Sequence, residues 1–269
     1  MTIKNLYHYT KAETAIRKIL PEKILRMNHL ANMNDPKENL LHLIDYTETI
    51  NPLRKFPNNA DEFLMALNIR EKTRITSFTT DKNVEIENKS QLMNGYEFQK
   101  MWSFYGQNHE GICLEIDKNL FSNENRVKIK EHKIINRKVN YKFHQFSYLR
   151  TPLHGVSSEK YPDHKSPSST EHWEKFIKDE KEVNERFFTK NIDWEGESEY
   201  RFLTFSTYSE DIYLSINKSL SKVILGLNFS KHLLPSVVAL VPEEKIYQIQ
   251  FNETDGRFRI EKVNLFNDF

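Results

Sequence analysis

The residues best suited to chemistry are one histidine near the start of the chain and a run of carboxylates far downstream. His8 lies between two tyrosines in the strand-like phrase Leu6-Tyr7-His8-Tyr9-Thr10, which leads directly into an amphipathic stretch. Three alternate glutamates precede a strongly β-type segment at 200–205, namely Glu195, Glu197 and Glu199. An imidazole and a carboxylate on strand ends, brought together by folding, are suited to holding a nucleotide sugar.

Other kinds of site are weakly supported. The single cysteine, Cys113, lies in the apolar run 111–116 and is predicted to be a buried strand thiol, which excludes a disulfide framework and a cysteine-type zinc site within the chain. His154, His164 and His172 are spaced irregularly in a Ser/Pro-rich stretch, so no metal site is expected. The most basic stretch contains Lys128, Lys130, Lys133, Arg137, Lys138 and Lys142. It fits either a solvated strand face or a patch that tracks phosphates.

Composition indicates an ordered globular protein. The chain has 269 residues, 38% of them apolar, and a formal net charge of +1. Its acids and bases are interleaved, so no overall field indicates a nucleic-acid or membrane partner. No signal-peptide pattern or apolar run of membrane-spanning length is present. We expect a soluble cytoplasmic protein that forms one domain over 1–269, with no membrane contact.

The hydrophobic pattern predicts the elements. Helices are expected at 12–20 (ended by Pro21), 38–46, 61–69, over most of 89–105, from Trp173 to Phe187, and at 230–240. Strands are expected at the opening phrase, 24–27, 74–79, 111–117, one or two within 127–141, and at 200–205, 211–216, 222–225, 246–251 and 257–263. The segment 149–170, rich in Ser, Pro and His, is predicted to be a long flexible loop. The fold class is therefore α+β, with a mixed or antiparallel β core and flanking helices.

Seven short phrases occur in an ordered series along the chain. They are Leu6-Tyr7-His8-Tyr9-Thr10, Asn34-Asp35-Pro36-Lys37-Glu38, Ser77-Phe78-Thr79, Met101-Trp102-Ser103-Phe104-Tyr105, Gly111-Ile112-Cys113-Leu114, Glu199-Tyr200-Arg201 and Val223-Ile224-Leu225-Gly226. Together they resemble a widespread bacterial family of unknown function (domain of unknown function twenty-nine seventy-one). The resemblance extends from Leu6 to Leu240.

The opening strand, histidine and helix also resemble the start of ADP-ribosyltransferases of the His-Tyr-Glu type. This resemblance implies an ADP-ribosyltransferase-like domain with NAD as substrate and no metal. It implies that His8 binds the adenosine ribose with Thr10 beside it, and that Glu199 holds the nicotinamide ribose. Tyr9 stands where that family usually has glycine.

The resemblance leaves the rest of the site open. Phe78 or Tyr105 would be the aromatic that encloses nicotinamide, with Trp102 nearby, although the helical spacing of Trp102 and Tyr105 also suits a core. Arg201 is either a phosphate ligand or an intramolecular partner of a carboxylate.

The chemistry explains why a carboxylate is needed. Cleavage of the nicotinamide glycosidic bond passes through a cation-like ribosyl transition state, which a neighbouring carboxylate stabilises. Glu197 would face the same side as Glu199 if the strand has already begun there, and would then be a candidate base.

These observations lead to an NAD-dependent ADP-ribosyltransferase-like enzyme acting on a macromolecular acceptor, either nucleic acid or protein, as a bacterial toxin or phage-defence effector. Two alternatives remain open. One is an NAD or nucleotide hydrolase that uses the same cleft, and the other is a non-catalytic sensor that binds a nucleotide or a partner protein. The sequence leaves the oligomeric state open.

Overall fold

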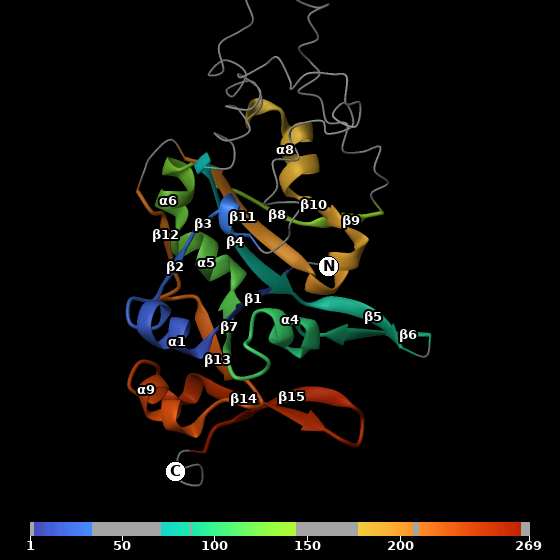
Figure 1. Ribbon diagram of the computed structural model, residues 1–269, viewed down its shortest axis with the longest axis vertical. Coiled ribbons are helices and arrows are strands. Elements are labelled where there is room, and N and C mark those ends of the chain that lie inside the picture. The colour runs from blue at the N-terminus through green and yellow to red at the C-terminus, as the bar shows by residue number, and fades with distance from the viewer. Residues whose placement is uncertain (1–2, 34–70, 87, 144–176, 207–209, 265–269) are drawn as a thin grey trace, which may run out of the picture.

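The computed structural model of the protein describes residues 3–33, 71–86, 88–143, 177–206 and 210–264 (Figure 1). The helices predicted at 38–46 and 61–69, the loop predicted at 149–170 and the start of the helix predicted from Trp173 lie outside the described residues. In the part of the chain that is described, no helix is long and apolar enough to cross a membrane.

A nine-stranded sheet forms the centre of the molecule. Eight of its strands follow the order β15-β14-β13-β7-β1-β4-β11-β8. The ninth strand, β3, pairs with β4 on the same side as β1. Their bounds are β1 Asn5–Thr10, β3 Asn28–His29, β4 Thr73–Thr80, β7 Ile112–Asp117, β8 Ile135–Lys138, β11 Glu199–Phe205, β13 Leu220–Leu225, β14 Ile246–Asn252 and β15 Arg257–Lys262. Within the described residues, only β13 and β14 of this sheet run parallel, and its other strand pairs are antiparallel. The sheet is therefore mixed, and the α+β class is confirmed.

One face of the sheet carries the largest apolar core. Alternation in β1 points Leu6 to this face, while Phe78 of β4 and Phe202 of β11 reach it from the neighbouring strands. Three helical segments cover it: α1 (Ala12–Thr14) with the π-helical turn η1 (Ala15–Ile19), α5 (Lys118–Glu124) and α9 (Leu234–Val238). The amphipathic helix predicted at 12–20 is thus present, because its apolar residues all pack on this core.

The other face carries two separate apolar clusters. Val183 and Phe187 of α8 (Glu180–Phe187) pack on Ile75 and Leu203 at one end. At the other end, Trp102 of α4 (Gln99–Phe104) packs on a cluster that includes Tyr7, Tyr9 and Cys113. Cys113 is buried and free, as predicted. In Figure 1, α8 lies at one end of the molecule, near β8, β9 and β10, whereas β14, β15 and α9 lie at the other end.

Smaller elements surround the sheet. Three two-stranded pairs are formed by β5 (Lys82–Ile86) with β6 (Lys89–Met93), β9 (Asn140–Lys142) with β10 (Thr189–Asn191), and β2 (Ile24–Arg26) with β12 (Tyr213–Ser215). The remaining segments are α6 (Arg126–Glu131) and the short 3-10 helices η2 (Leu30–Asn32), η4 (Gly95–Glu97), η7 (Ile192–Glu197), η8 (Lys231–Leu233) and η9 (Glu243–Lys245).

Two sequence predictions were wrong in part. The helix predicted over 89–105 begins only at Gln99, because Lys89–Met93 instead pairs with β5 across a turn in which Asn88 has a positive φ of 62°. Asparagine tolerates this left-handed conformation, which favours tight hairpin turns. The strands predicted within 127–141 are preceded by helix α6. Here Ile129 packs on the core while Val127 stays 76% exposed, a contrast that strand alternation does not predict.

Candidate functional site

Four charged side chains form a buried network between the two apolar clusters of the second face. Lys190, Glu197, Glu199 and Arg201 are 4%, 3%, 4% and 0% exposed. The Lys190 ammonium lies 2.8 Å from Glu197 Oε2 and 3.0 Å from Glu199 Oε2. The Arg201 guanidinium donates to both oxygens of Glu199, at 2.6 Å from Nε and 2.8 Å from Nη2. Each buried carboxylate therefore has a cation within bonding distance, as burial of charge requires.

The backbone that carries the glutamates is bent sharply. Glu197 ends η7 and Glu199 starts β11, while Ser198 between them is left-handed, with φ 45°. Thr80 fixes this turn, since its backbone N–H and its hydroxyl both reach the Ser198 carbonyl at 2.9 Å. The strand has not yet begun at Glu197, so strand alternation does not bring the two carboxylates together. The bend at Ser198 and the shared Lys190 do so instead.

The network keeps Glu199 ionised. Burial by itself would raise the pKa of Glu199, but Arg201 and then Lys190 outweigh it and lower that pKa to about 2. Tyr141 of β9 accepts a hydrogen bond from the Glu199 backbone N–H at 2.8 Å. Burial, followed by the nearby charge of Glu199, raises the pKa of the Tyr141 phenol. At neutral pH the site therefore holds a carboxylate beside a neutral phenol.

Aromatic and hydroxyl groups complete the surroundings of the carboxylates. Tyr105, directly after α4, donates its hydroxyl to Glu197 Oε1 at 2.7 Å. The ring of Trp194 in η7 lies 5.0 Å from the Lys190 ammonium, close enough for a cation–π contact. Thr79 is paired with Glu199 across β4 and β11, so their side chains share a face. The Thr79 hydroxyl is buried and has no hydrogen-bond partner among the described residues.

His8 lies on the opposite face of the sheet from Glu199. The register pairs Tyr7 with Thr79, and Thr79 with Glu199, so these three side chains point to one face. His8, one residue further along β1, points to the other face. There its Nδ1 lies 3.2 Å from the Ser77 carbonyl, its ring packs edge-on against Phe78 at 5.8 Å, and burial lowers its pKa. The single cleft predicted for His8 and Glu199 is therefore not formed on one face of the sheet.

The predicted site residues thus divide into two groups. The face of Glu199 also carries Glu197, Tyr105 and Arg201, and Arg201 is the intramolecular partner of a carboxylate. The face of His8 carries Thr10 and Phe78, with Phe78 inside the large core. Trp102 lies on the Glu199 side but is fully buried, where its indole N–H donates to the Tyr96 carbonyl at 2.8 Å.

Sequence reasoning missed two members of the network. Lys190 is one lysine in a chain with 39 Lys and Arg residues, and nothing in its neighbourhood marks it as buried. Tyr141 lies near the end of the basic stretch, next to Lys142, and its sequence neighbours do not mark it as a contact of Glu199. Both lie on the parallel β9–β10 pair, where Lys190 is opposite Tyr141. Parallel pairing of two three-residue strands that lie far apart in sequence leaves no local signal.

Comparison with known proteins supports part of the family resemblance. Residues 101–202 match the model of a family described as "Protein of unknown function (DUF2971)". The match begins in α4, includes Tyr105, Lys190, Glu197 and Glu199, and ends just after Arg201. It therefore spans every member of the buried network. No curated protein and no solved structure matches the chain.

Proposed function

We propose that the protein is an NAD-dependent ADP-ribosyltransferase in which Glu199 is the catalytic carboxylate. The observation that carries this proposal is the pairing of two buried carboxylates, Glu197 and Glu199, around one ammonium group, with Glu199 held ionised. A carboxylate that is ionised at neutral pH can stabilise the positive charge that develops on a ribosyl group.

The reaction assigns a separate role to each carboxylate. The bond between the ribose C1′ and the nicotinamide nitrogen breaks, and nicotinamide leaves with the bonding electron pair. Glu199 stabilises the positive charge that develops on the ribose. An acceptor oxygen or nitrogen then bonds to C1′ and gives its proton to Glu197, whose Oε1 also accepts the hydroxyl of Tyr105. The Thr79 hydroxyl, buried on the same face and without a partner among the described residues, is available to a ribose hydroxyl.

The burial of Glu199 restricts the access of substrate to it. Glu199 is nearly fully buried, and η7 and the end of α4 lie beside it. Lys100 of α4 donates to the Asp193 carbonyl of η7 at 2.8 Å, and its ammonium lies 5.5 Å from the Trp194 ring. The proposal therefore requires the segments that cover Glu199 to move before substrate reaches it. Because His8 and Phe78 lie on the other face, Tyr105 is the aromatic that this proposal assigns to the site.

Release of nicotinamide from NAD tests the proposal. We expect Glu199→Gln to lower the rate by about two to three decades, because loss of one electrostatic group that stabilises a transition state costs about 3 kcal/mol. Glu195→Gln is the matched control, because Glu195 lies in the same turn, is half exposed and forms an ion pair with Lys82 outside the buried network. Unchanged turnover in folded Glu199→Gln would remove Glu199 from the reaction.

A non-catalytic nucleotide- or partner-binding sensor is the second candidate, and a specific observation favours it. Two carboxylates and two cations compensate one another fully, so the network has no net charge to present to a ribosyl cation. Such a protein would release no nicotinamide from NAD, and absence of NAD binding by calorimetry as well would remove both enzyme candidates. Nicotinamide release without labelling of any acceptor would instead identify a hydrolase that uses water.

In the cell, we propose that the protein acts as a cytoplasmic toxin or phage-defence effector. Its expression in a bacterial host is expected to arrest growth, whereas expression of Glu199→Gln is not. Equal growth arrest by both proteins, at matched protein levels, would separate toxicity from the proposed reaction.

A further inference from the structure

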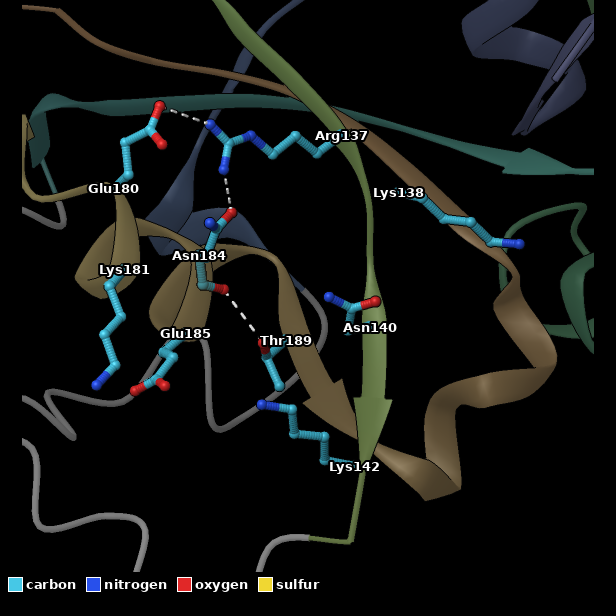
Figure 2. A pocket seen from close by; sticks show the side chains of 9 residues that line it. All are labelled: Arg137, Lys138, Asn140, Lys142, Glu180, Lys181, Asn184, Glu185 and Thr189. Carbon is cyan, nitrogen blue, oxygen red and sulfur yellow. Dashed lines mark hydrogen bonds and ion pairs between the residues drawn. The ribbon is translucent and has the colours of Figure 1, made fainter. Parts of the chain in front are cut away.

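A groove lies between helix α8 and the strands β8, β9 and β10 (Figure 2). Every side chain that lines it is polar. Arg137 and Lys138 come from β8, Lys142 from β9 and Lys181 from α8, while Glu180 and Glu185 of α8 supply two carboxylates. The remaining lining residues are Asn140, Asn184 and Thr189. The groove thus has four cations and two anions, but no apolar wall.

The cations of the groove differ in how they are held. Arg137 is fixed by α8, donating to Asn184 Oδ1 at 2.5 Å and to Glu180 Oε1 at 3.3 Å, contacts that Figure 2 shows as dashed lines. These contacts use two of its five N–H donors. Lys142 and Lys181 are exposed, and no ion pair or side-chain hydrogen bond of their ammonium groups is found within the described ranges. Figure 2 shows Lys142 extending toward Thr189, and Lys181 extending outward from α8. Two ammonium groups are therefore available to a ligand.

The floor of the groove is connected to the buried network. In the β9–β10 pair, Thr189 is opposite Asn140, and Lys190 is opposite Tyr141. Successive side chains of a strand point to opposite faces. One face of this pair therefore holds Lys190 and Tyr141 against Glu199, while the other presents Asn140 and Thr189 to the groove. In addition, the Val139 backbone N–H donates to the Glu199 carbonyl at 2.9 Å.

We propose that this groove binds the phosphodiester backbone of a single-stranded nucleic acid. Arginine, lysine, asparagine and threonine are side chains that contact phosphate oxygens. A protein partner is less suited, since the centre of a protein interface is depleted of charge and enriched in aromatic residues, and this lining has neither property. No aromatic ring lines the groove for bases to stack on, so the expected contacts are to the sugar–phosphate backbone, which carries no direct sequence information.

Under the proposed reaction, the groove favours nucleic acid as the class of acceptor, with the β9–β10 pair lying between a strand held there and Glu199. A nucleic acid would then be the macromolecule that receives ADP-ribose. This assignment rests on the proposed function, whereas the binding itself does not.

Fluorescence anisotropy of the full chain with a labelled oligothymidylate of about 20 nucleotides, longer than one such binding site, tests the proposal. Titrations between about 50 and about 200 mM salt give the slope of log K against log salt. The double variant Lys142→Ala/Lys181→Ala should weaken binding and reduce that slope by about 1.4, because each phosphate contact of a single strand contributes about 0.7. The double variant Lys18→Ala/Lys231→Ala, with the same charge change at exposed positions outside the groove lining, should keep the wild-type slope.

The measurement contains no NAD, so its outcome is independent of the proposed reaction. An unchanged slope in Lys142→Ala/Lys181→Ala, or equal loss in the control variant, would overturn the groove assignment even if nicotinamide is released. Absence of oligonucleotide binding by the wild type at the lowest salt would overturn it as well. Conversely, groove-dependent binding together with no cleavage of NAD would retain the groove and reject the transferase.

Discussion

At the scale of single residues, Lys190 decides how the site is held together. Its ammonium lies within 3.0 Å of both Glu197 and Glu199, and Trp194 covers it. Without Lys190, the two buried carboxylates of the network would share Arg201 as its remaining cation. Since removal of one partner from a buried pair leaves uncompensated charge, this position is more sensitive than its residue type suggests.

We therefore expect Lys190→Met to lower the free energy of unfolding by about 3 to 5 kcal/mol. Lys82→Met provides the comparison, because Lys82 also pairs with a glutamate near this turn, Glu195 at 3.0 Å, but both side chains are about a third to a half exposed. Exposed pairs contribute about 0 to 1 kcal/mol. Urea unfolding of both variants measures the difference, and similar losses for both would show that the network has little energetic weight.

At the scale of elements, the connection between α4 and β7 has an unusual backbone. Gln107, Asn108 and His109 are consecutive residues with positive φ, at 51°, 51° and 68°. The His109 ring is stacked between Trp102 and Phe258, at 5.3 and 5.7 Å. Left-handed residues other than glycine cost free energy, so surrounding contacts must hold them.

Gly226 supplies one of these contacts. A Cβ built at Gly226 would lie 2.0 Å from the His109 carbonyl oxygen, which is backbone and can move only with the whole loop. Gly226→Ala should therefore destabilise the protein by more than Gly256→Ala. A Cβ at Gly256 meets nothing within 4 Å, so that substitution carries only the strain of its positive φ, about 1 to 2 kcal/mol. Thermal unfolding of the two variants provides the ranking, and the reverse order would contradict the close packing of Gly226 on His109.

At the scale of the whole molecule, the buried network makes the free energy of unfolding depend on pH. The pKa of Glu199 falls from an ordinary 4.5 to about 2, so the folded state binds a proton less readily than the unfolded chain. A carboxylate with a lowered pKa contributes stability above the unfolded value, and that contribution is lost as pH falls toward the folded value.

The free energy of unfolding should therefore decrease steadily between about pH 4.5 and about pH 2. In Glu199→Gln this component is absent, so the stability difference between wild type and variant should shrink as the solution is acidified. Urea titrations followed by circular dichroism between neutral pH and about pH 3 give this difference. A constant difference across that range would mean that Glu199 does not titrate in this way.

The sequence predicts correctly those helices and strands whose signal lies within their own residues. The apolar and β-type residues that predict β1, β4, β7 and β11 lie within each segment, and these strands are found where they were expected. The helix at 12–20 is recognised for the same reason. The hairpin β5–β6 was mistaken for helix because Lys89–Met93 has few apolar residues, and its strand character comes from pairing with Lys82–Ile86.

The candidate site was likewise predicted from the sequence only in part. By itself, the sequence indicated an α+β chain, a carboxylate pair at Glu197 and Glu199 leading into a strand, and an arginine beside them. Only the tertiary structure decided that Lys190 joins those carboxylates, and that His8 lies on the other face. The physical reason is register: a strand presents alternate residues to two faces, and a one-residue shift in pairing exchanges them. Because β4 lies between β1 and β11, the pairing of Tyr7 with Thr79 and of Thr79 with Glu199 fixes which side chains meet.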